Sequence, residues 1–241
     1  MTTSRSRLLA GLGAAPIVAV AVRTAWRLAR TAALVRRSEA FQVAPPEPTK
    51  RLLIVGDSTG VGTGASTPQT SLAGLIAAAH PHLTIVNRSA DGATFERIAA
   101  QLEVGGRFDA VLVLGGGNDT IRLTGAGALR AALSQVLFLA RGRSDTVVLM
   151  PAGNVGNAPF FLWPWSRLMT RRARILHAIA RQTAAAHGAT YVSLFKERAA
   201  DPFAQDPDRL HAADGLHPSD AGYALWHHEL SMQSALSDAL R

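Results

Sequence analysis

The sequence predicts an α/β fold in which helices cover both faces of a parallel β-sheet, a three-layer α/β/α sandwich. Short runs rich in aliphatic and β-branched residues alternate along the chain with longer helical segments, as in repeated strand–helix units. The short runs are apolar throughout, which is typical of strands buried on both faces. Together these observations favour a single sheet between two helical layers.

Five strands are expected after residue 50, and each is followed by a helix. The expected strands are Arg51–Val55, Leu83–Asn87, Ala110–Leu114, Thr146–Met150 and Thr190–Leu194. The expected helices are Ser71–Ala79, Phe95–Val104, Ala126–Ala140, Arg167–His187 and Ser219–Ala239. At 241 residues, the chain has room for one sizeable α/β domain and an appendage.

Three regions are predicted: a membrane-associating or signal-like segment (1–40), a proline-rich linker (41–50) and a catalytic domain (51–241). The run Leu8–Val22 is uncharged and mostly apolar. It is shorter than the about twenty residues of a spanning helix, but it suits a signal-peptide core. Alternatively, residues 1–40 lie on a membrane surface while their arginines reach the headgroups.

The net charge of +8 is concentrated in the amino-terminal segment. Residues 1–50 hold eight Arg or Lys against two Glu, whereas residues 51–241 hold seventeen basic against fifteen acidic residues. A nucleic-acid partner is not expected, because such a partner calls for a basic surface on the folded domain.

The arginines around the apolar run predict the localisation. Five arginines follow the run and two precede it, which favours a membrane-associated domain on the cytoplasmic face. Export after cleavage is the alternative.

The absence of cysteine excludes disulfides and thiolate chemistry. Candidate chemistry lies instead in the loops that follow the strands, since loops at the carboxyl ends of parallel strands gather at one edge of a sheet. Ser58 follows the first strand, and Asp214 and His217 stand three apart near the other end of the chain. A serine, a histidine base and a carboxylate that orients the base are the parts of a nucleophilic hydrolase. Taken alone, Ser58 also suits a helix N-cap.

Acyl transfer also needs hydrogen-bond donors for the developing oxyanion. Gly92 can offer a backbone N–H, and Asn118 can offer its side-chain amide. A phosphate-binding loop is the competing interpretation of the glycines before Asn118. That segment has neither the GxGxxG spacing nor the Gly-Lys-Ser/Thr ending of a nucleotide loop.

Four blocks of residues resemble, in order, those of the SGNH (GDSL-type) hydrolase family. They are Gly56-Asp57-Ser58, the segment Asn87 to Thr94, Gly116-Gly117-Asn118-Asp119, and the segment Asp214 to Pro218. The resemblance covers about residues 50–235. Two departures are Thr59-Gly60, where many members have leucine after the serine, and the additional Gly115.

The resemblance implies a flavodoxin-like sandwich with a five-stranded parallel sheet and no metal or organic cofactor. It implies that Ser58 is the nucleophile, His217 the base and Asp214 the carboxylate that orients it. The oxyanion hole would consist of the backbone N–H groups of Ser58 and Gly92 and the side chain of Asn118.

The segment after the fourth strand suggests the substrate. Residues 150–156 are similar to those of esterase and lysophospholipase members, and an aromatic stretch follows. Candidate substrate-binding residues are Asn154, Phe160, Phe161 and Trp163. An exposed aromatic patch would suit acyl chains or a lipid surface, and a hydrophobic lid packed on the domain is the alternative.

The predicted function is that of a serine esterase that cleaves an acyl ester or a lysophospholipid-like substrate through an acyl-enzyme. A carbohydrate O-acetyl esterase with the same residues is one alternative. A non-catalytic binding module, tethered to a membrane, is the alternative from another class of protein.

Overall fold

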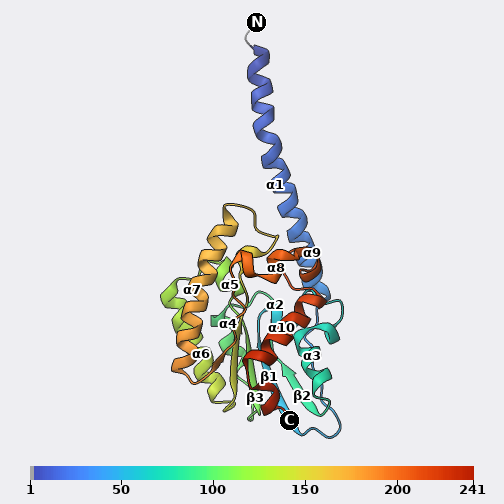
Figure 1. Cartoon of the computed structure of the whole chain (residues 1–241), viewed down its shortest axis with the longest axis vertical. Coiled ribbons are helices and arrows are strands. Elements are labelled where there is room, and N and C mark those ends of the chain that lie inside the picture. Colours follow the sequence, from blue (N-terminus) through green and yellow to red (C-terminus); the bar gives the residue numbers. More distant parts are fainter. Residues whose placement is uncertain (1–2) are drawn as a thin grey trace.

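The computed structural model describes residues 3–241, with side chains from residue 18 onward, and contains one parallel sheet with helices on both faces (Figure 1). The strands run in the order β2–β1–β3–β4–β5, and every neighbouring pair is parallel. Their bounds are Lys50–Gly56 (β1), Leu83–Asn87 (β2), Ala110–Gly115 (β3), Val147–Pro151 (β4) and Thr190–Tyr191 (β5). The predicted fold class is confirmed.

Each face of the sheet carries its own apolar core. Leu53 and Val55 of β1 pack with side chains of α4, α6 and α7, while Leu52 and Ile54 pack with those of α3, α10 and α11. All four β1 side chains are fully buried, which explains the unbroken apolar run in the sequence. The helices are Leu72–Ala79 (α3), Phe95–Gln101 (α4), Ala126–Arg141 (α6), Trp165–Ala186 (α7), Asp220–Gln233 (α10) and Leu236–Ala239 (α11).

Short helical turns occupy several of the loops. Four of them are Ser58–Val61 (α2), Gly117–Ile121 (α5), Pro202–Gln205 (α8) and Pro207–Leu210 (α9). Because α2 and α5 follow β1 and β3 directly, they lie at the carboxyl edge of the sheet, and α8 and α9 lie at the same end of the molecule (Figure 1).

The predicted helix over 219–239 is divided in two at Ser234. The backbone of Ser234 is extended, and its hydroxyl donates to the Leu230 carbonyl oxygen over 2.7 Å. Serine competes in this way for the hydrogen bonds that would continue a helix. The last turn, α11, therefore forms a separate element.

The fifth strand is shorter than the predicted Thr190–Leu194. Beyond Tyr191, the backbone of Ser193 pairs with a side chain of α10: its N–H donates to Oε1 of Gln233 over 2.8 Å, and Nε2 of Gln233 donates to its carbonyl over 3.2 Å. The Gln233 amide thus takes the place of a neighbouring strand along the outer edge of the sheet, on the side of β5 away from β4.

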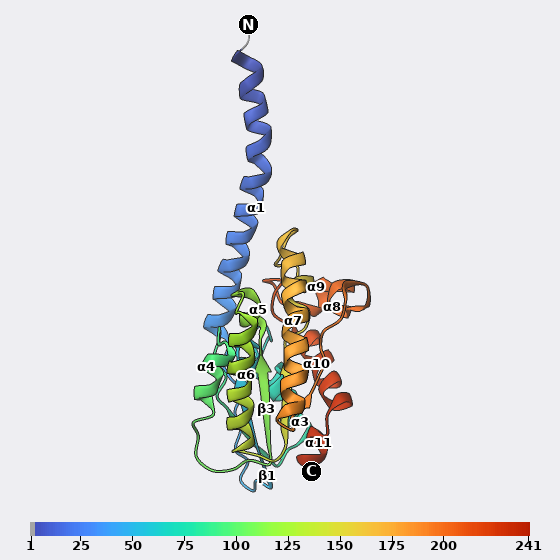
Figure 2. The same ribbon diagram turned by 90° about the vertical axis from the view of Figure 1, so that its left-hand side faces the viewer.

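A long helix, α1 (Thr3–Arg37), precedes the sheet. Its amino-terminal part projects away from the domain, and its carboxyl-terminal part lies alongside it (Figures 1 and 2). The side chains of residues 1–17, which include much of the predicted apolar run Leu8–Val22, lie outside the described part. Within the described part, no helix combines the length and the apolar character needed to cross a membrane.

The segment predicted as a linker, 41–50, lies against the sheet. Phe41 and Val43 pack against the core beside α3, and Val43 pairs antiparallel with Ile85 of β2 through backbone hydrogen bonds of 3.3 and 2.8 Å. The region therefore extends the edge of the sheet beyond β2, and the boundaries at residues 40 and 50 stay a prediction.

Candidate active site

Ser58 is the first residue of α2, at the point where β1 ends. Asp57 caps this helix, because its carboxylate accepts hydrogen bonds from the Thr59 N–H over 2.9 Å and from the Thr59 hydroxyl over 2.7 Å. The N-cap role that suits a serine at this junction thus belongs to Asp57. Ser58 keeps its hydroxyl free for other partners.

The hydroxyl of Ser58 meets His217, which comes from the loop before α10. Nε2 of His217 lies 3.0 Å from Oγ of Ser58, and Nδ1 lies 2.7 Å from Oδ2 of Asp214. Residues 159 positions apart in the sequence are thereby joined in one hydrogen-bonded chain. We refer to Ser58, His217 and Asp214 as the candidate triad.

The turn that carries Asp214 and His217 is held by its own backbone. The other oxygen of Asp214, Oδ1, accepts hydrogen bonds from the N–H groups of Leu216 (2.9 Å) and His217 (3.1 Å). Gly215 has a φ of 68°, a left-handed conformation that favours glycine. The three-residue spacing between carboxylate and imidazole follows from this tight turn.

The electrostatics of the candidate triad fix the tautomer of His217. Burial acts to raise the pKa of Asp214, but hydrogen bonds from the His217 ring and from two backbone N–H groups lower it to about 2. An ionised carboxylate only accepts hydrogen bonds, so Nδ1 of His217 carries the proton. Nε2 is then an acceptor that faces the Ser58 hydroxyl, as a general base must.

Asn118 lies on the second turn at this edge, α5, directly after β3. Its side-chain nitrogen is 3.5 Å from Oδ2 of Asp57, and both residues line the cavity that contains Ser58 and His217. Burial raises the pKa of Asp57, although the hydrogen bonds from Thr59 oppose the shift. Asp57 therefore links the start of α2 to the side chain predicted to stabilise an oxyanion.

Gly92, the third predicted oxyanion donor, lies in the loop after β2. Its φ is 72°, and its carbonyl accepts a hydrogen bond from Arg122 over 3.0 Å. It is not among the residues that line the cavity. Its assignment to an oxyanion hole stays a prediction.

A largely apolar cavity opens beside Ser58 and His217. The apolar residues that line it are Ile121, Ala152, Val155, Ala158, Leu194, Phe203, Leu216, Pro218 and Trp226. They come from several loops at the carboxyl edge of the sheet and from α10. The walls are suited to the hydrocarbon part of a substrate.

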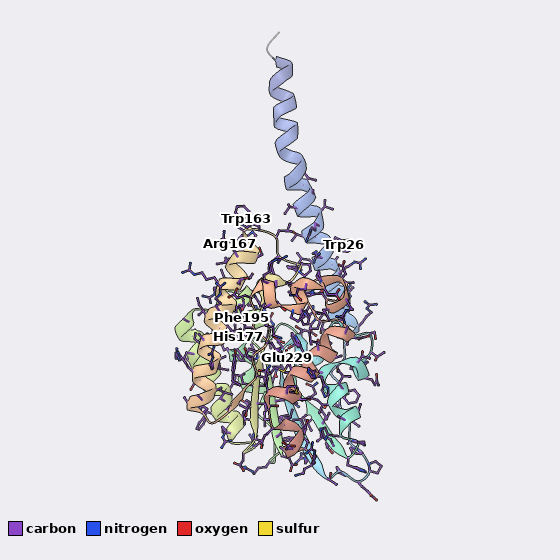
Figure 3. The ribbon with its side chains drawn as sticks, in the orientation of Figure 1. Trp26, Trp163, Arg167, His177, Phe195 and Glu229 are labelled. Atoms are coloured by element: carbon purple, nitrogen blue, oxygen red, sulfur yellow. The ribbon has the colours of Figure 1, made fainter. Side chains whose placement is uncertain are left out.

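The four candidate substrate-binding residues occupy different positions. Asn154 lines the cavity, but its side chain accepts from the Gly156 N–H and donates to the Lys196 carbonyl, so it holds the loop. The aromatic residues Phe160, Phe161 and Trp163 are not part of the cavity lining. Trp163 is 74% exposed and lies at the end of the domain from which α1 projects (Figure 3).

Sequence reasoning missed several residues of the cavity that come from the turns before α10. His211 and Asp201 line it together with Phe203. The ring of His211 packs edge-on against Phe203, with a distance of 5.0 Å between ring centroids, and burial lowers the pKa of His211. None of these residues lies next to a recognisable motif, and only the proline-initiated turns α8 and α9 mark the region in the sequence.

No group of three or more His, Asp or Glu side chains in the described part of the chain is arranged to hold a metal ion. A buried serine, histidine and carboxylate in one hydrogen-bonded chain are the elements of a serine hydrolase.

Comparison with known proteins identifies the family. The sequence model of the GDSL-like lipase/acylhydrolase family matches residues 54–225. The chain belongs to this family, whose members are serine hydrolases of ester bonds. It is also similar to a GDSL-like esterase of Mycobacterium tuberculosis, with 30% identity over 200 residues. That match covers 78% of this chain and 62% of the relative, so the chain spans less than two thirds of the relative's length.

Solved structures show the same fold. The lipase/acylhydrolase from Enterococcus faecalis superimposes with a TM-score of 0.59 at 22% identity, over 76% of this chain and 94% of that one. An extracellular lipase from Streptomyces rimosus gives a TM-score of 0.55 at 19% identity, over 77% of this chain and all of that one. At these identities the likeness concerns the fold.

Proposed function

We propose that this protein is a serine esterase that hydrolyses acyl esters through an acyl-enzyme. The observation that carries the proposal is the hydrogen-bonded chain from Oγ of Ser58 through His217 to Asp214. This geometry supplies a nucleophile, a base with the correct tautomer and a buried carboxylate that orients the base.

The reaction would proceed in two halves. Ser58 attacks the ester carbonyl carbon while Nε2 of His217 takes the hydroxyl proton, and the side chain of Asn118 and the N–H of Ser58 stabilise the oxyanion. His217 then returns the proton to the leaving alcohol, which leaves the acyl group on Ser58. In the second half, His217 activates a water molecule, and the acid and the free serine are regenerated.

The apolar lining of the cavity supports an acyl chain as the part of the substrate that is recognised. Apolar side chains such as Ile121, Leu194 and Trp226 form much of the lining, beside the polar side chains of Asn154, Asp201 and His211. A fatty acyl ester or a lysophospholipid therefore fits these walls better than an acetylated carbohydrate, which needs several polar contacts around the ring.

Hydrolysis of p-nitrophenyl esters of graded chain length tests this proposal. The measurement compares the full chain with Ser58→Ala. The wild-type protein is expected to turn over medium or long acyl esters, and Ser58→Ala is expected to lose turnover. Release of acetate alone, from short esters or acetylated saccharides, would replace the proposal with the carbohydrate esterase. No turnover of any ester would favour the non-catalytic module.

We also propose that the protein associates with a membrane through α1, with its domain on the cytoplasmic side. Val18, Val20 and Val22 of α1 are exposed, and so is Trp26, over which Arg30 stacks at 4.0 Å. Apolar and tryptophan side chains flanked by arginines are typical of helices that bind anionic bilayers.

Sedimentation with phosphatidylglycerol vesicles tests the membrane proposal. The full chain is expected to sediment with the vesicles, and Val20→Asp is expected to do so less. A full chain that stays in the supernatant would contradict the proposal.

A further inference from the structure

The carboxyl-terminal part of α1 contacts the candidate triad. Three polar side chains at four-residue spacing, Arg23, Arg27 and Thr31, lie on one face of this helix, because residues four apart in an α-helix are neighbours on its surface. Each of them donates a hydrogen bond to a loop that surrounds the site. The segment predicted as a separate leader thus reaches the candidate active site at the carboxyl edge of the sheet.

Thr31 contacts the carboxylate of the candidate triad. Its hydroxyl lies 3.0 Å from Oδ2 of Asp214, the same oxygen that lies 2.7 Å from Nδ1 of His217. The carboxylate is an acceptor, so the Thr31 hydroxyl donates. Oδ2 therefore has two donors, one from the base and one from α1, and Oδ1 has two backbone donors of its own.

The direction of the Thr31 hydroxyl is unusual for a helix. A threonine within a helix commonly donates back to the carbonyl four residues earlier, and Thr24 of the same helix does so, over 2.9 Å to Val20. Thr31 donates to Asp214, 183 residues away.

Arg27 and Arg23 hold α1 in the place that this contact requires. Nη1 of Arg27 donates to the backbone carbonyl of Asp214 over 3.0 Å, and Nη2 of Arg23 donates to the Pro159 carbonyl over 2.7 Å. The guanidinium of Arg27 lies so close to Gly215 that a Cβ at that residue would overlap it. The turn of the candidate triad and α1 therefore fit each other closely.

We infer that Thr31 is a positioning residue of the active site, one that α1 supplies to hold the Asp214 carboxylate in line with His217. The inference rests on the proposed function. With the Thr31 donor removed, Oδ2 keeps only the His217 ring as a partner, and the two backbone donors on Oδ1 alone set the angle of the carboxylate. The orientation of His217 is then less well fixed, which affects the proton transfers and leaves the acyl-binding walls unchanged.

Steady-state kinetics of three full-length variants test the inference. Thr31→Val keeps the shape of the side chain but has no hydroxyl, and its kcat is expected to fall about ten-fold while KM stays nearly constant. Thr31→Ser restores the donor and is expected to restore most of kcat. Thr24→Val removes a hydroxyl from the same helix at a position away from the site and is expected to match the wild-type protein.

Equal kcat values for Thr31→Val and the wild-type protein, with Ser58→Ala inactive, would overturn the inference and leave the esterase intact. A loss of kcat that Thr31→Ser does not recover would also overturn it, since a packing defect would then explain the loss.

A second measurement does not depend on turnover. The low-field proton resonance of the His217–Asp214 hydrogen bond is expected to shift in Thr31→Val and not in Thr24→Val. An unchanged resonance in both variants would contradict the inference even if the protein hydrolysed no ester.

Discussion

At the scale of single residues, Asp57 connects Ser58, the proposed nucleophile, to Asn118, the proposed oxyanion donor. Its fully buried carboxylate caps α2 through Thr59 and lies 3.5 Å from the side-chain nitrogen of Asn118. A buried carboxylate with these partners restrains the amide rotamer. The amide is then already oriented when negative charge develops on the substrate oxygen, which is the condition for effective stabilisation.

The variant Asn118→Ala is expected to lose about 100- to 1,000-fold in kcat with little change in KM, as is usual when one oxyanion donor is removed. The reason is that Asn118 would act on charge that appears only in the transition state. Initial rates with the best ester of the panel measure the effect, and a thermal melt confirms that the variant is folded. A kcat equal to that of the wild-type protein would remove Asn118 from the oxyanion site.

Residues with local motifs could be predicted at this scale, and residues without them could not. Asp214 and His217 are close in sequence, and Ser58 follows an obvious strand, so pattern alone suggested all three. Thr31 has no such signal, because a threonine within an arginine- and alanine-rich helix looks like any other polar residue. No local motif marks His211 either.

At the scale of elements, the turn Asp214–His217 is fixed by the glycine at its centre. Gly215 meets two demands at once: its φ of 68° favours glycine, and Arg27 of α1 occupies the space where a side chain would begin. Gly188, after α7, has a similar φ of 63° but nothing within 4 Å of an added Cβ. Gly188 therefore provides a control for a left-handed alanine that lies away from the candidate triad and from α1.

Gly188→Ala is expected to cost about 1 kcal/mol of the free energy of unfolding, the cost of a left-handed non-glycine residue, and to leave kcat unchanged. Gly215→Ala carries the same strain within the turn of the candidate triad and also displaces the Arg27 guanidinium from the Asp214 carbonyl, so kcat should fall about ten-fold. Urea denaturation and initial rates on both variants make the comparison. Equal kcat values for the two variants would show that the position of α1 does not matter to the site.

Element types were easier to predict than element ends. The strand runs are apolar and bounded by glycine or polar residues, so all five strands were predicted. The break at Ser234 depends on a hydrogen bond made by the Ser234 side chain, which periodicity does not reveal. The short turns α2 and α5 begin two residues after the ends of β1 and β3, so their positions in the chain follow from those strands.

At the scale of the whole molecule, one buried histidine joins the sheet edge to α7. Nε2 of His177 lies 2.8 Å from the carbonyl oxygen of Ala152, and Nδ1 lies 2.6 Å from the Tyr191 hydroxyl (Figure 3). The carbonyl requires a proton on Nε2, so Nδ1 accepts from Tyr191. Burial lowers the pKa of His177 to about 4, from an ordinary value of 6.5.

This shift makes the stability of the fold depend on pH. Between about pH 6.5 and pH 4 the unfolded chain binds a proton at this histidine and the folded chain does not, so the stabilisation is complete above 6.5 and decreases as the pH falls. For His177 alone, the free energy of unfolding should decrease by about 2 kcal/mol between pH 7 and pH 5.

His177→Gln keeps a donor for the Ala152 carbonyl but does not titrate. Urea denaturation of both proteins at pH 7 and pH 5 should therefore show a shallower pH dependence in the variant by about 2 kcal/mol. The other titrating groups are common to both proteins and cancel in the difference. Parallel pH curves would show that His177 is not responsible.

The place of the site in the molecule could be predicted, but the place of α1 could not. Parallel strands bring their carboxyl ends to one edge, so four loops were expected to meet there. The contact of α1 with Asp214 depends on the path of residues 38–49 along β2, and no periodicity or composition in that proline-rich stretch indicates a path.

The central claim is that His217 activates Ser58 as a nucleophile, and labelling with a fluorophosphonate tests it most directly. Intact-mass measurement of the full chain should show one added group, and peptide mapping should place it on Ser58. Ser58→Ala should remain unlabelled, and His217→Ala should react much more slowly. An unlabelled wild-type protein, or a label on another serine while Ser58 stays free, would contradict the account.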